Sequence, residues 1–496
     1  MLRRIFTLKF LLWTGFVLAV LVLTFITEEN WRGRRAWETY RAAAEKRGVK
    51  LFLEDFIQPD IPDAENYAAI PLIRDLFAKP KDGETPPSPF KLPVGKVPDP
   101  SNDLKSRRFD VTGWQQFLLK TELLAEKSDS AARDILHALE KYEPALQQLR
   151  DASSRPKCKF PTHWENGVAT QLPHLTFCLA ATKLFCIRAQ AHLALGESLS
   201  ALAELRNALR LHRAFGSELS VIAGLVRMSS LATIEYSVWD GLAGRQWTDE
   251  DLAALEKHFS ELRIGEDWRF AFASERGFVN ACLLKQVGQS PAELDRDTDG
   301  FCSDCNDRPL NKWIVFRTFP RGWMYLLMIR NNDYFDWLIA RCAGPESETP
   351  IEIFPTYATS SDWSKTTLGH PGVIELEYIF MLMSQQVFDT AYKRYLFTHT
   401  RTQETRLACI LERFRRAKGG FPEKLHELVP TFIDAIPKDA FDGKPFRYRR
   451  NADGGYDLWS IGSDRKDDGG HIDPNQKIPE SQDDWIWHMP GQPKTP

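Results

Sequence analysis

Residues 460–473 contain four aspartates and three glycines, which are Asp464, Asp467, Asp468 and Asp473 and Gly462, Gly469 and Gly470. Carboxylates that lie this close repel one another unless they are solvated, protonated or bound to a cation. Calcium accepts about six to eight oxygen ligands in irregular geometry, so one glycine-containing loop can supply carboxylates and carbonyls together. The spacing therefore predicts a calcium site in this loop, and the alternative is a group of solvated surface aspartates.

A second acidic segment, DRDTDGFCSDCND, occupies residues 295–307. Asp295, Asp297 and Asp299 stand at alternate positions before a glycine, as in the first half of a calcium-binding loop. The bidentate glutamate expected at the twelfth position is replaced by Asn306, so the motif is incomplete. This segment is the weaker calcium candidate, and the alternative is a solvated acidic loop.

The same segment holds a Cys-x-x-Cys pair, Cys302 and Cys305. This spacing is typical of a redox pair or of half a zinc site. No second Cys-x-x-Cys occurs in the sequence, which argues against a four-thiolate zinc site within one chain. The neighbouring carboxylates should raise the thiol pKa values, whereas a catalytic thiol needs an electropositive setting. We therefore expect a structural or inactive pair, with thiol redox chemistry as the alternative.

Composition and motifs favour a protein that is neither an enzyme nor a nucleic-acid binder. The net charge of −3 gives no sign of the basic surface that nucleic-acid binding requires. The sequence contains no Gly-x-Ser-x-Gly, His-Glu-x-x-His or phosphate-loop motif. Because the residues of a catalytic triad are scattered in sequence, an anchored extracytoplasmic hydrolase without a recognisable motif is the alternative.

The apolar stretch at residues 10–27 carries no charge, and the location of the remaining chain depends on it. A bilayer core about 30 Å thick needs roughly 20 apolar residues, and about 17 is the lower limit. Bulky residues follow the stretch where signal cleavage requires small ones, so a retained anchor is favoured over a cleaved signal peptide. Arg3, Arg4 and Lys9 precede it, which favours a cytoplasmic N-terminus and a chain that lies mostly beyond the membrane.

Shifts in composition divide this mostly α-helical chain into five parts. We expect a membrane anchor at residues 1–30, juxtamembrane helices and a proline-rich linker at 31–110, a bundle of helical hairpins at 111–343, a second linker at 344–372, and a long helix with a small α+β module and tail at 373–496. The helical body and the module must therefore hold the acidic segments at residues 295–307 and 460–473 in place.

Within and before the helical body, local patterns predict particular elements. Residues 175–215 resemble one tetratricopeptide unit, with small residues at the helix crossing and Leu-Gly at the turn. A solenoid needs about three such units, so we expect a single hairpin inside a bundle. Residues 49–53 favour a short strand and residues 65–77 a helix. Thr248 and Asp251 have the spacing of a capping box.

Residues 402–473 carry short motifs in a definite order, namely GGFP, LVP, IPKD, DGKPFRY and GGYDLWSIGSD. In this order they resemble the globular end of type II secretion major pseudopilins, an ending also found on large uncharacterised bacterial envelope proteins. The pattern predicts strands at residues 445–449 and 456–461 joined by a hairpin turn. In the alternative to a calcium site, the aspartates are solvated and the tail from Pro474 onward, with Trp485 and Trp487, covers a sheet edge.

The resemblance implies that the loop after the last strand binds calcium through Asp464 and the acidic residues that follow it. Arg465 stands where the family pattern has a glycine. Residues 1–27 lack a prepilin leader, so the module is expected to be a borrowed domain and not a pilus subunit. Together with the anchor, the resemblance implies a single-pass protein of the bacterial inner membrane with a periplasmic bulk. We expect a scaffold that binds other proteins and is linked to secretion or envelope assembly.

Overall fold

The computed structural model describes residues 2–78, 90, 108–288, 320–342, 374–470 and 484–491. Most of these residues are helical, and the only strands within the described ranges belong to one small sheet near the C-terminus. Several of the predicted site residues lie outside the described residues, namely Asp295, Asp297, Asp299, Cys302, Cys305 and Asp473.

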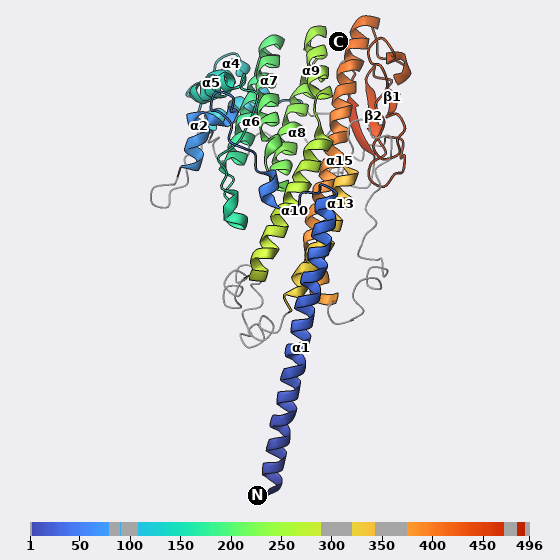
Figure 1. Ribbon diagram of the computed structural model, residues 1–496. Coiled ribbons are helices and arrows are strands. Elements are labelled where there is room, and N and C mark those ends of the chain that lie inside the picture. The colour runs from blue at the N-terminus through green and yellow to red at the C-terminus, as the bar shows by residue number, and fades with distance from the viewer. Residues whose placement is uncertain are drawn as a thin grey trace.

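Helix α1, Leu2–Lys46, is continuous for 45 residues and extends far beyond the body (Figure 1). Side chains from residue 9 to residue 25 are exposed, and they include the apolar stretch almost to its end. The helix ends before Gly48, which has a φ of +74° and so takes the left-handed conformation that glycine allows. Among the described residues, α1 and α8, Val221–Ala243, are long and apolar enough to cross a membrane, and α8 is packed inside the body.

The predicted strand at residues 49–53 is wrong, and the predicted helix at residues 65–77 is present only as three short helical pieces. The carbonyls of Lys50 and Leu51 accept hydrogen bonds from the side chains of Arg276 and Asn280 at 2.8 and 2.9 Å. Side chains of helix α10, Ile264–Gly288, thus take the place of a neighbouring strand. The chain then forms short turns of helix, which are η1 (Leu53–Phe56), η2 (Tyr67–Ala69), α2 (Pro71–Arg74) and η3 (Asp75–Phe77).

The body is built from helices of moderate length that pack side by side (Figure 1). The first region contains α3 (Val111–Lys120), α4 (Ala131–Leu139), η4 (Glu140–Tyr142), α5 (Glu143–Ala152) and η5 (Trp164–Ala169). The second contains α6 (Pro173–Ala194), α7 (Ser198–Ala214), η6 (Phe215–Ser217), α8, α9 (Asp249–Ser260), α10 (Ile264–Gly288) and α13 (Gly322–Arg341). Helix α15, Ile374–Lys418, then leads to η9, Leu425–Leu428.

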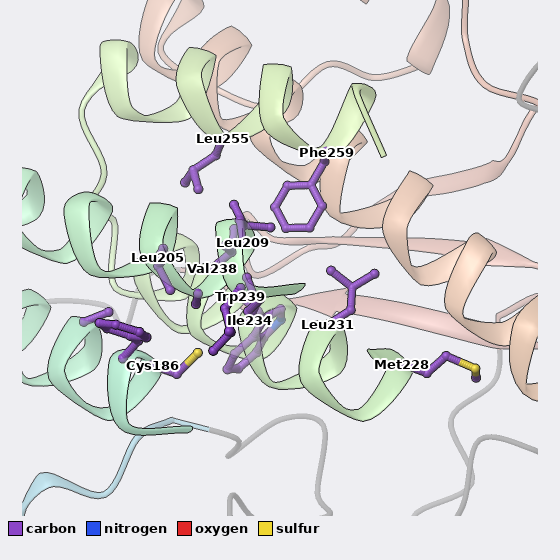
Figure 2. Close-up of a cluster of buried hydrophobic side chains, with 14 of the residues drawn as sticks. Cys186, Leu205, Leu209, Met228, Leu231, Ile234, Val238, Trp239, Leu255 and Phe259 are labelled. Carbon is purple, nitrogen blue, oxygen red and sulfur yellow. The ribbon is translucent and has the colours of Figure 1, made fainter. Parts of the chain in front are cut away.

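The hydrophobic core runs through the middle of this bundle. Figure 2 shows apolar side chains of α6 to α9 that point toward one another, among them Leu205, Leu209, Leu231, Val238 and Phe259. Helices α6 and α7 form the predicted hairpin at residues 175–215, and the turn between them has Gly196 at a φ of +77°. The hairpin packs on α8, which therefore lies between the α6–α7 pair and α15.

The sheet has three antiparallel strands in the order β1 (Arg447–Arg450), β2 (Tyr456–Ser460) and β3 (Trp485–Met489). The first two match the predicted hairpin within two residues, and its turn is closed by a hydrogen bond from Asn451 N to Gly455 O at 2.9 Å. The tail does more than cover an edge, because Trp485 and Trp487 belong to a strand that pairs with β2.

The sheet packs against the helices and shares their core. Trp239 on α8 donates its Nε1–H to the carbonyl of His488 at 2.9 Å. Phe397 on α15 contacts the ring of Trp485 edge-on, with 5.1 Å between the ring centroids. One continuous set of buried apolar residues extends from Tyr67 to Met489. The sheet is therefore held at the far side of α15 from the α6–α7 hairpin (Figure 1).

Candidate functional site: the polar network of the C-terminal module

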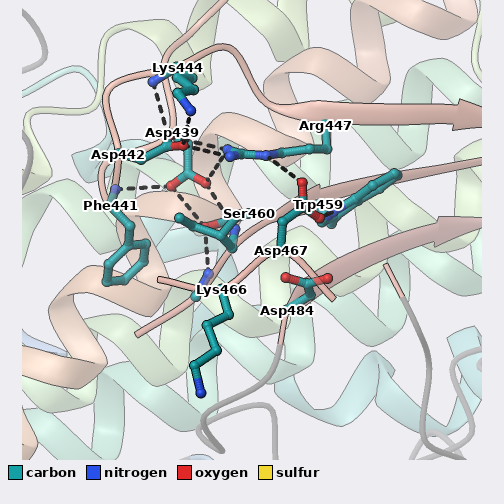
Figure 3. Close-up of polar contacts among 12 residues, drawn as sticks. Asp439, Phe441, Asp442, Lys444, Arg447, Trp459, Ser460, Lys466, Asp467 and Asp484 are labelled. Carbon is teal, nitrogen blue, oxygen red and sulfur yellow. Dashed lines mark hydrogen bonds and ion pairs between the residues drawn. The ribbon is translucent and has the colours of Figure 1, made fainter. Parts of the chain in front are cut away.

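Asp439 lies at the centre of the network in Figure 3 and is fully buried. Its Oδ1 accepts hydrogen bonds from Phe441 N at 3.0 Å and from Ser460 Oγ at 2.9 Å. Its Oδ2 accepts from Ile461 N at 2.9 Å and from Arg447 Nη1 at 3.1 Å. Burial raises the pKa of Asp439, although all four donors favour the charged form. This carboxylate joins the end of β2 to the loop that precedes β1.

Arg447, the first residue of β1, bonds to three carboxylates. Its guanidinium donates to Asp439, to Asp442 Oδ2 at 2.5 Å and to Asp467 Oδ2 at 3.3 Å. Asp442 Oδ1 also accepts from Lys444 N at 3.0 Å. The aspartates of the IPKD and DGKPFRY motifs therefore have a structural function, because they fix one arginine between two loops and the sheet.

Asp467 is the residue through which the acidic loop joins this network. Its Oδ1 accepts from Trp459 Nε1 and from Gly469 N, both at 3.1 Å, while its Oδ2 accepts from Arg447. Burial pushes the pKa of Asp467 upward, but the bonds from Trp459, Gly469 and Arg447 outweigh this and lower it. Asp467 is thus ionised and already has a cationic partner.

The other predicted calcium ligands of the described loop are less constrained. Asp464 Oδ1 accepts from Lys466 N at 2.9 Å, which closes a local turn. Asp468 is exposed. Arg465 has a φ of +61°. This left-handed conformation costs roughly 1 kcal/mol for a residue with a side chain, so glycine would fit this position with less strain.

Asp484, which precedes β3, was missed in the sequence analysis. It is 6% exposed, and its Oδ2 accepts from Gly470 N at 2.8 Å. Its Oδ1 is buried and has no hydrogen-bond partner among the described residues. Burial and the nearby charges of Asp467 and Asp468 raise its pKa. Its position directly before the alternating WIWHM strand could have indicated a residue at a sheet end, but nothing local pairs it with a loop whose Gly470 is 14 residues away in sequence.

The aspartates of this network do not form a metal site among the described residues. Within the described ranges, no three His, Cys, Asp or Glu side chains are grouped so that they could hold a metal ion. The structure brings Asp467 and Asp468 close enough to Asp484 to affect its pKa, while Asp464 bonds within its own turn. Two nearby negative charges, and one buried oxygen without a partner among the described residues, leave Asp484 the least satisfied carboxylate of this network.

The cysteines of the described residues have no features of reactive thiols. Burial raises the pKa of Cys186 to about 12 and raises that of Cys178 and Cys409 well above the ordinary value. A thiol in such surroundings stays protonated and is a poor nucleophile. Thiol redox chemistry in this chain would therefore depend on Cys302 and Cys305, outside the described residues.

A separate cleft of about 640 Å³ lies where the residues after α5 meet the end of α7. Among the described residues that line it there are four cations and no carboxylate or histidine, the cations being Arg155, Lys157, Arg210 and Arg213. Two of them have acidic partners, since Lys157 bonds to Glu65 at 2.8 Å and Arg213 to Glu261 at 3.0 Å. Its described lining thus presents guanidinium groups that suit an acidic ligand.

Comparisons of this chain with protein-family models, with curated proteins and with solved structures found no match.

Proposed function

We propose that this chain is a single-pass, membrane-anchored scaffold of the bacterial envelope, without catalytic activity, that binds other proteins. The observation that carries the proposal is the continuity of α1, which passes from an exposed apolar stretch directly into the packed body. An isolated apolar helix of this length is unstable in water, whereas a bilayer about 30 Å thick would cover it.

Packing beyond the apolar stretch favours a retained anchor over a cleaved signal. Glu29, Gly33, Trp37 and Ala44 follow one another at helical spacing on α1 and are buried against the body. The helix that would leave the membrane is thus also a structural element of the body. A cut at the end of residues 10–27 would fall within one turn of Glu29 and would fray this packed segment.

Two features support protein binding as the role of the body. The first is the resemblance of residues 402–473 to the pseudopilin ending, which gives type II secretion or envelope assembly as the setting and the periplasm as the compartment. The second is the basic cleft, where Arg155 and Arg210 donate to carbonyl oxygens and carry guanidinium groups that suit the carboxylates of an acidic segment. The α6–α7 hairpin, which resembles one tetratricopeptide unit, forms part of the same region because α7 lines the cleft.

Removal of residues 2–24 tests the anchor, because this cut leaves Phe25 and every buried residue of α1 in place. We expect the full chain to remain in the membrane fraction after a carbonate wash. We expect the shortened chain to be soluble, with a helical circular dichroism signal that falls only by the share of the helical residues removed. Membrane association of the shortened chain would contradict the proposal. So would a mature N-terminus near residue 28 in intact-mass measurements of the full chain.

A further inference from the structure

Helix α13 begins beside the point at which α1 leaves its apolar stretch. Gly322 N donates to Asn30 Oδ1 at 2.8 Å, and Trp323 Nε1 donates to Glu29 Oε2 at 2.8 Å. The ring of Trp323 also contacts Phe25 edge-on, with 6.3 Å between the centroids. The first turn of α13 is therefore bonded to the last apolar turns of α1, across nearly 300 residues of sequence.

The two helices approach so closely here that neither can slide along the axis of the other. A Cβ atom at Gly33 would lie 2.0 Å from Gly322 O, and one at Gly322 would lie 2.0 Å from Glu29 O. Only glycine permits this backbone contact. The helices run parallel, because Arg47 at the end of α1 lies 3.9 Å from Asp336 near the end of α13. The start of α13 thus points toward the membrane side.

The length of the apolar stretch sets the depth of Trp323. Its 18 residues span about 27 Å at about 1.5 Å per residue, slightly less than a bilayer core of about 30 Å. All of residues 10–27 must then lie within the core, and Phe25 is close to its edge. Because the Trp323 ring rests on Phe25, it must lie at the boundary of the core and the headgroups, where tryptophan is enriched in membrane proteins.

Charged groups at the same level suit phospholipid headgroups. Three arginines follow the apolar stretch on α1, namely Arg32, Arg34 and Arg35. Arg35 lies over the ring of Trp31, which is 60% exposed, with 5.3 Å to the ring centroid. A tryptophan beside arginines at the end of a spanning helix can place its ring among the headgroups while the cations contact phosphate.

We propose that the first turn of α13 is a second membrane contact, which lies in the phospholipid headgroup layer beside α1 and holds the body upright on the bilayer. This inference rests on the proposed anchor. A body that was joined to the membrane by α1 alone could tilt at one helix, whereas two packed helix ends at the surface restrict tilt. The sheet and the basic cleft would then stand at a defined height above the membrane.

Photolabelling of the full chain in vesicles of phosphatidylethanolamine and phosphatidylglycerol tests this inference. One vesicle preparation contains a phospholipid with a diazirine in the acyl chain, and the other a phospholipid with a diazirine on the headgroup. We expect the acyl probe to label residues 10–27 and the headgroup probe to label residues 321–325, with neither probe labelling α7. Acyl labelling of residues 10–27 without headgroup labelling of residues 321–325 would overturn the inference and leave the anchor intact. Absence of both would overturn the anchor as well.

A pair of glycine variants on α1 tests whether packing sets the position of α13. Gly33→Val places a side chain against Gly322, whereas Gly15→Val meets nothing within 4 Å. We expect headgroup labelling of residues 321–325 to fall about threefold or more in Gly33→Val and to stay unchanged in Gly15→Val, because only the first pushes the helices apart. Acyl labelling of residues 10–27 should persist in both. Equal headgroup labelling in the two variants would overturn the inference.

Discussion

Buried carboxylates in the C-terminal half differ in how completely their oxygens are bonded. Both oxygens of Asp439 accept two hydrogen bonds each, so this group is a stable part of the fold. Glu404 on α15 has Oε2 bonded to Arg401 at 2.9 Å, but its buried Oε1 has no partner among the described residues. Asp484 has one such oxygen too. An incompletely bonded carboxylate tends to hold a proton or to recruit a cation.

Calcium binding at Asp484 would be visible as a change in thermal stability. A ligand that binds only the folded state stabilises it by about 2.7 kcal/mol at a hundredfold excess over Kd. We expect the full chain to melt several degrees higher in millimolar calcium than in chelator, by calorimetry in detergent. Asp484→Asn should remove the shift, since it removes the charge beside Asp467 and Asp468. Asp434→Asn, at an exposed aspartate of the same module, should retain it. An unchanged melting temperature of the full chain would favour solvated aspartates.

The burial of Glu404 should make the stability of the chain depend on pH. Burial raises the pKa of Glu404 from 4.5 to about 8, against the opposing effect of Arg401. Between these values the folded state binds more protons than the unfolded state, so the free energy of unfolding falls as the pH rises. Glu404→Gln should therefore be more stable than the native chain at pH 8 by about 1–2 kcal/mol, and this difference should shrink toward pH 5.

Denaturant unfolding at several pH values would measure this effect. Glu423→Gln is the matched control, because the Glu423 side chain is 73% exposed and its partner Arg450 is at the surface. Its pH profile should follow that of the native chain. A Glu404→Gln variant that is less stable than the native chain at pH 8 would show that the bond to Arg401 outweighs the burial of the charge.

At the scale of single elements, helix ends follow local chemistry closely. Thr248 Oγ1 accepts from Asp251 N, and Asp251 Oδ2 accepts from Thr248 N, both at 3.1 Å. This confirms the capping box that the sequence predicts at the start of α9. The glycines at residues 48 and 196 likewise take the positive φ values that end α1 and α6. Such signals need only a few neighbouring residues.

Loss of the α9 cap should have a moderate cost. Thr248→Ala removes the acceptor for Asp251 N, and we expect the free energy of unfolding to fall by about 1 kcal/mol. Thr233→Ala on α8 is the control, since the Thr233 hydroxyl only donates to Ser229 O within its own helix, at 2.9 Å. That variant should stay within about 0.5 kcal/mol of the native chain. Equal effects of both changes in denaturant unfolding would contradict the assignment of the cap.

At the scale of the whole molecule, the sheet and the helical body are one packed unit. Arg401 donates to Ile486 O at 3.1 Å and lies over the ring of Trp487, while Arg245 pairs with Glu412 at 2.6 Å. These contacts join α15 to β3 and to the turn that follows α8, and the apolar residues of all three share a common core. We therefore expect calorimetry and near-ultraviolet circular dichroism to report a single cooperative transition for the full chain.

Trp239→Phe tests whether the sheet and the helices form one unit, because it keeps an aromatic side chain, although a smaller one, and removes the bond to His488 O. We expect a loss of about 1–2 kcal/mol with the transition still single, since a buried carbonyl loses its donor while the shared core remains. Trp31→Phe, at an exposed tryptophan of α1, should change stability by less than about 0.5 kcal/mol. Separate unfolding of the sheet and the helices in the native chain would contradict a common core.

The sequence by itself determined the features that depend on neighbouring residues. The apolar helix at residues 10–27, the α6–α7 hairpin, the cap at Thr248 and the β1–β2 hairpin all follow from periodicity, capping residues and turn glycines. Tertiary structure decided what depends on distant partners. It replaced the strand expected at residues 49–53 by contacts with α10, and it made the tail into β3.

The candidate site divides in the same way, and for the same physical reason. The sequence shows that the aspartates at residues 464–468 belong to one loop. It does not show that Arg447 pairs with Asp467 or that Asp484 is buried. The bond between Glu29 and Trp323 joins residues 294 positions apart. No local pattern encodes such a pair, because its energy arises only when packing has excluded water and brought both groups together.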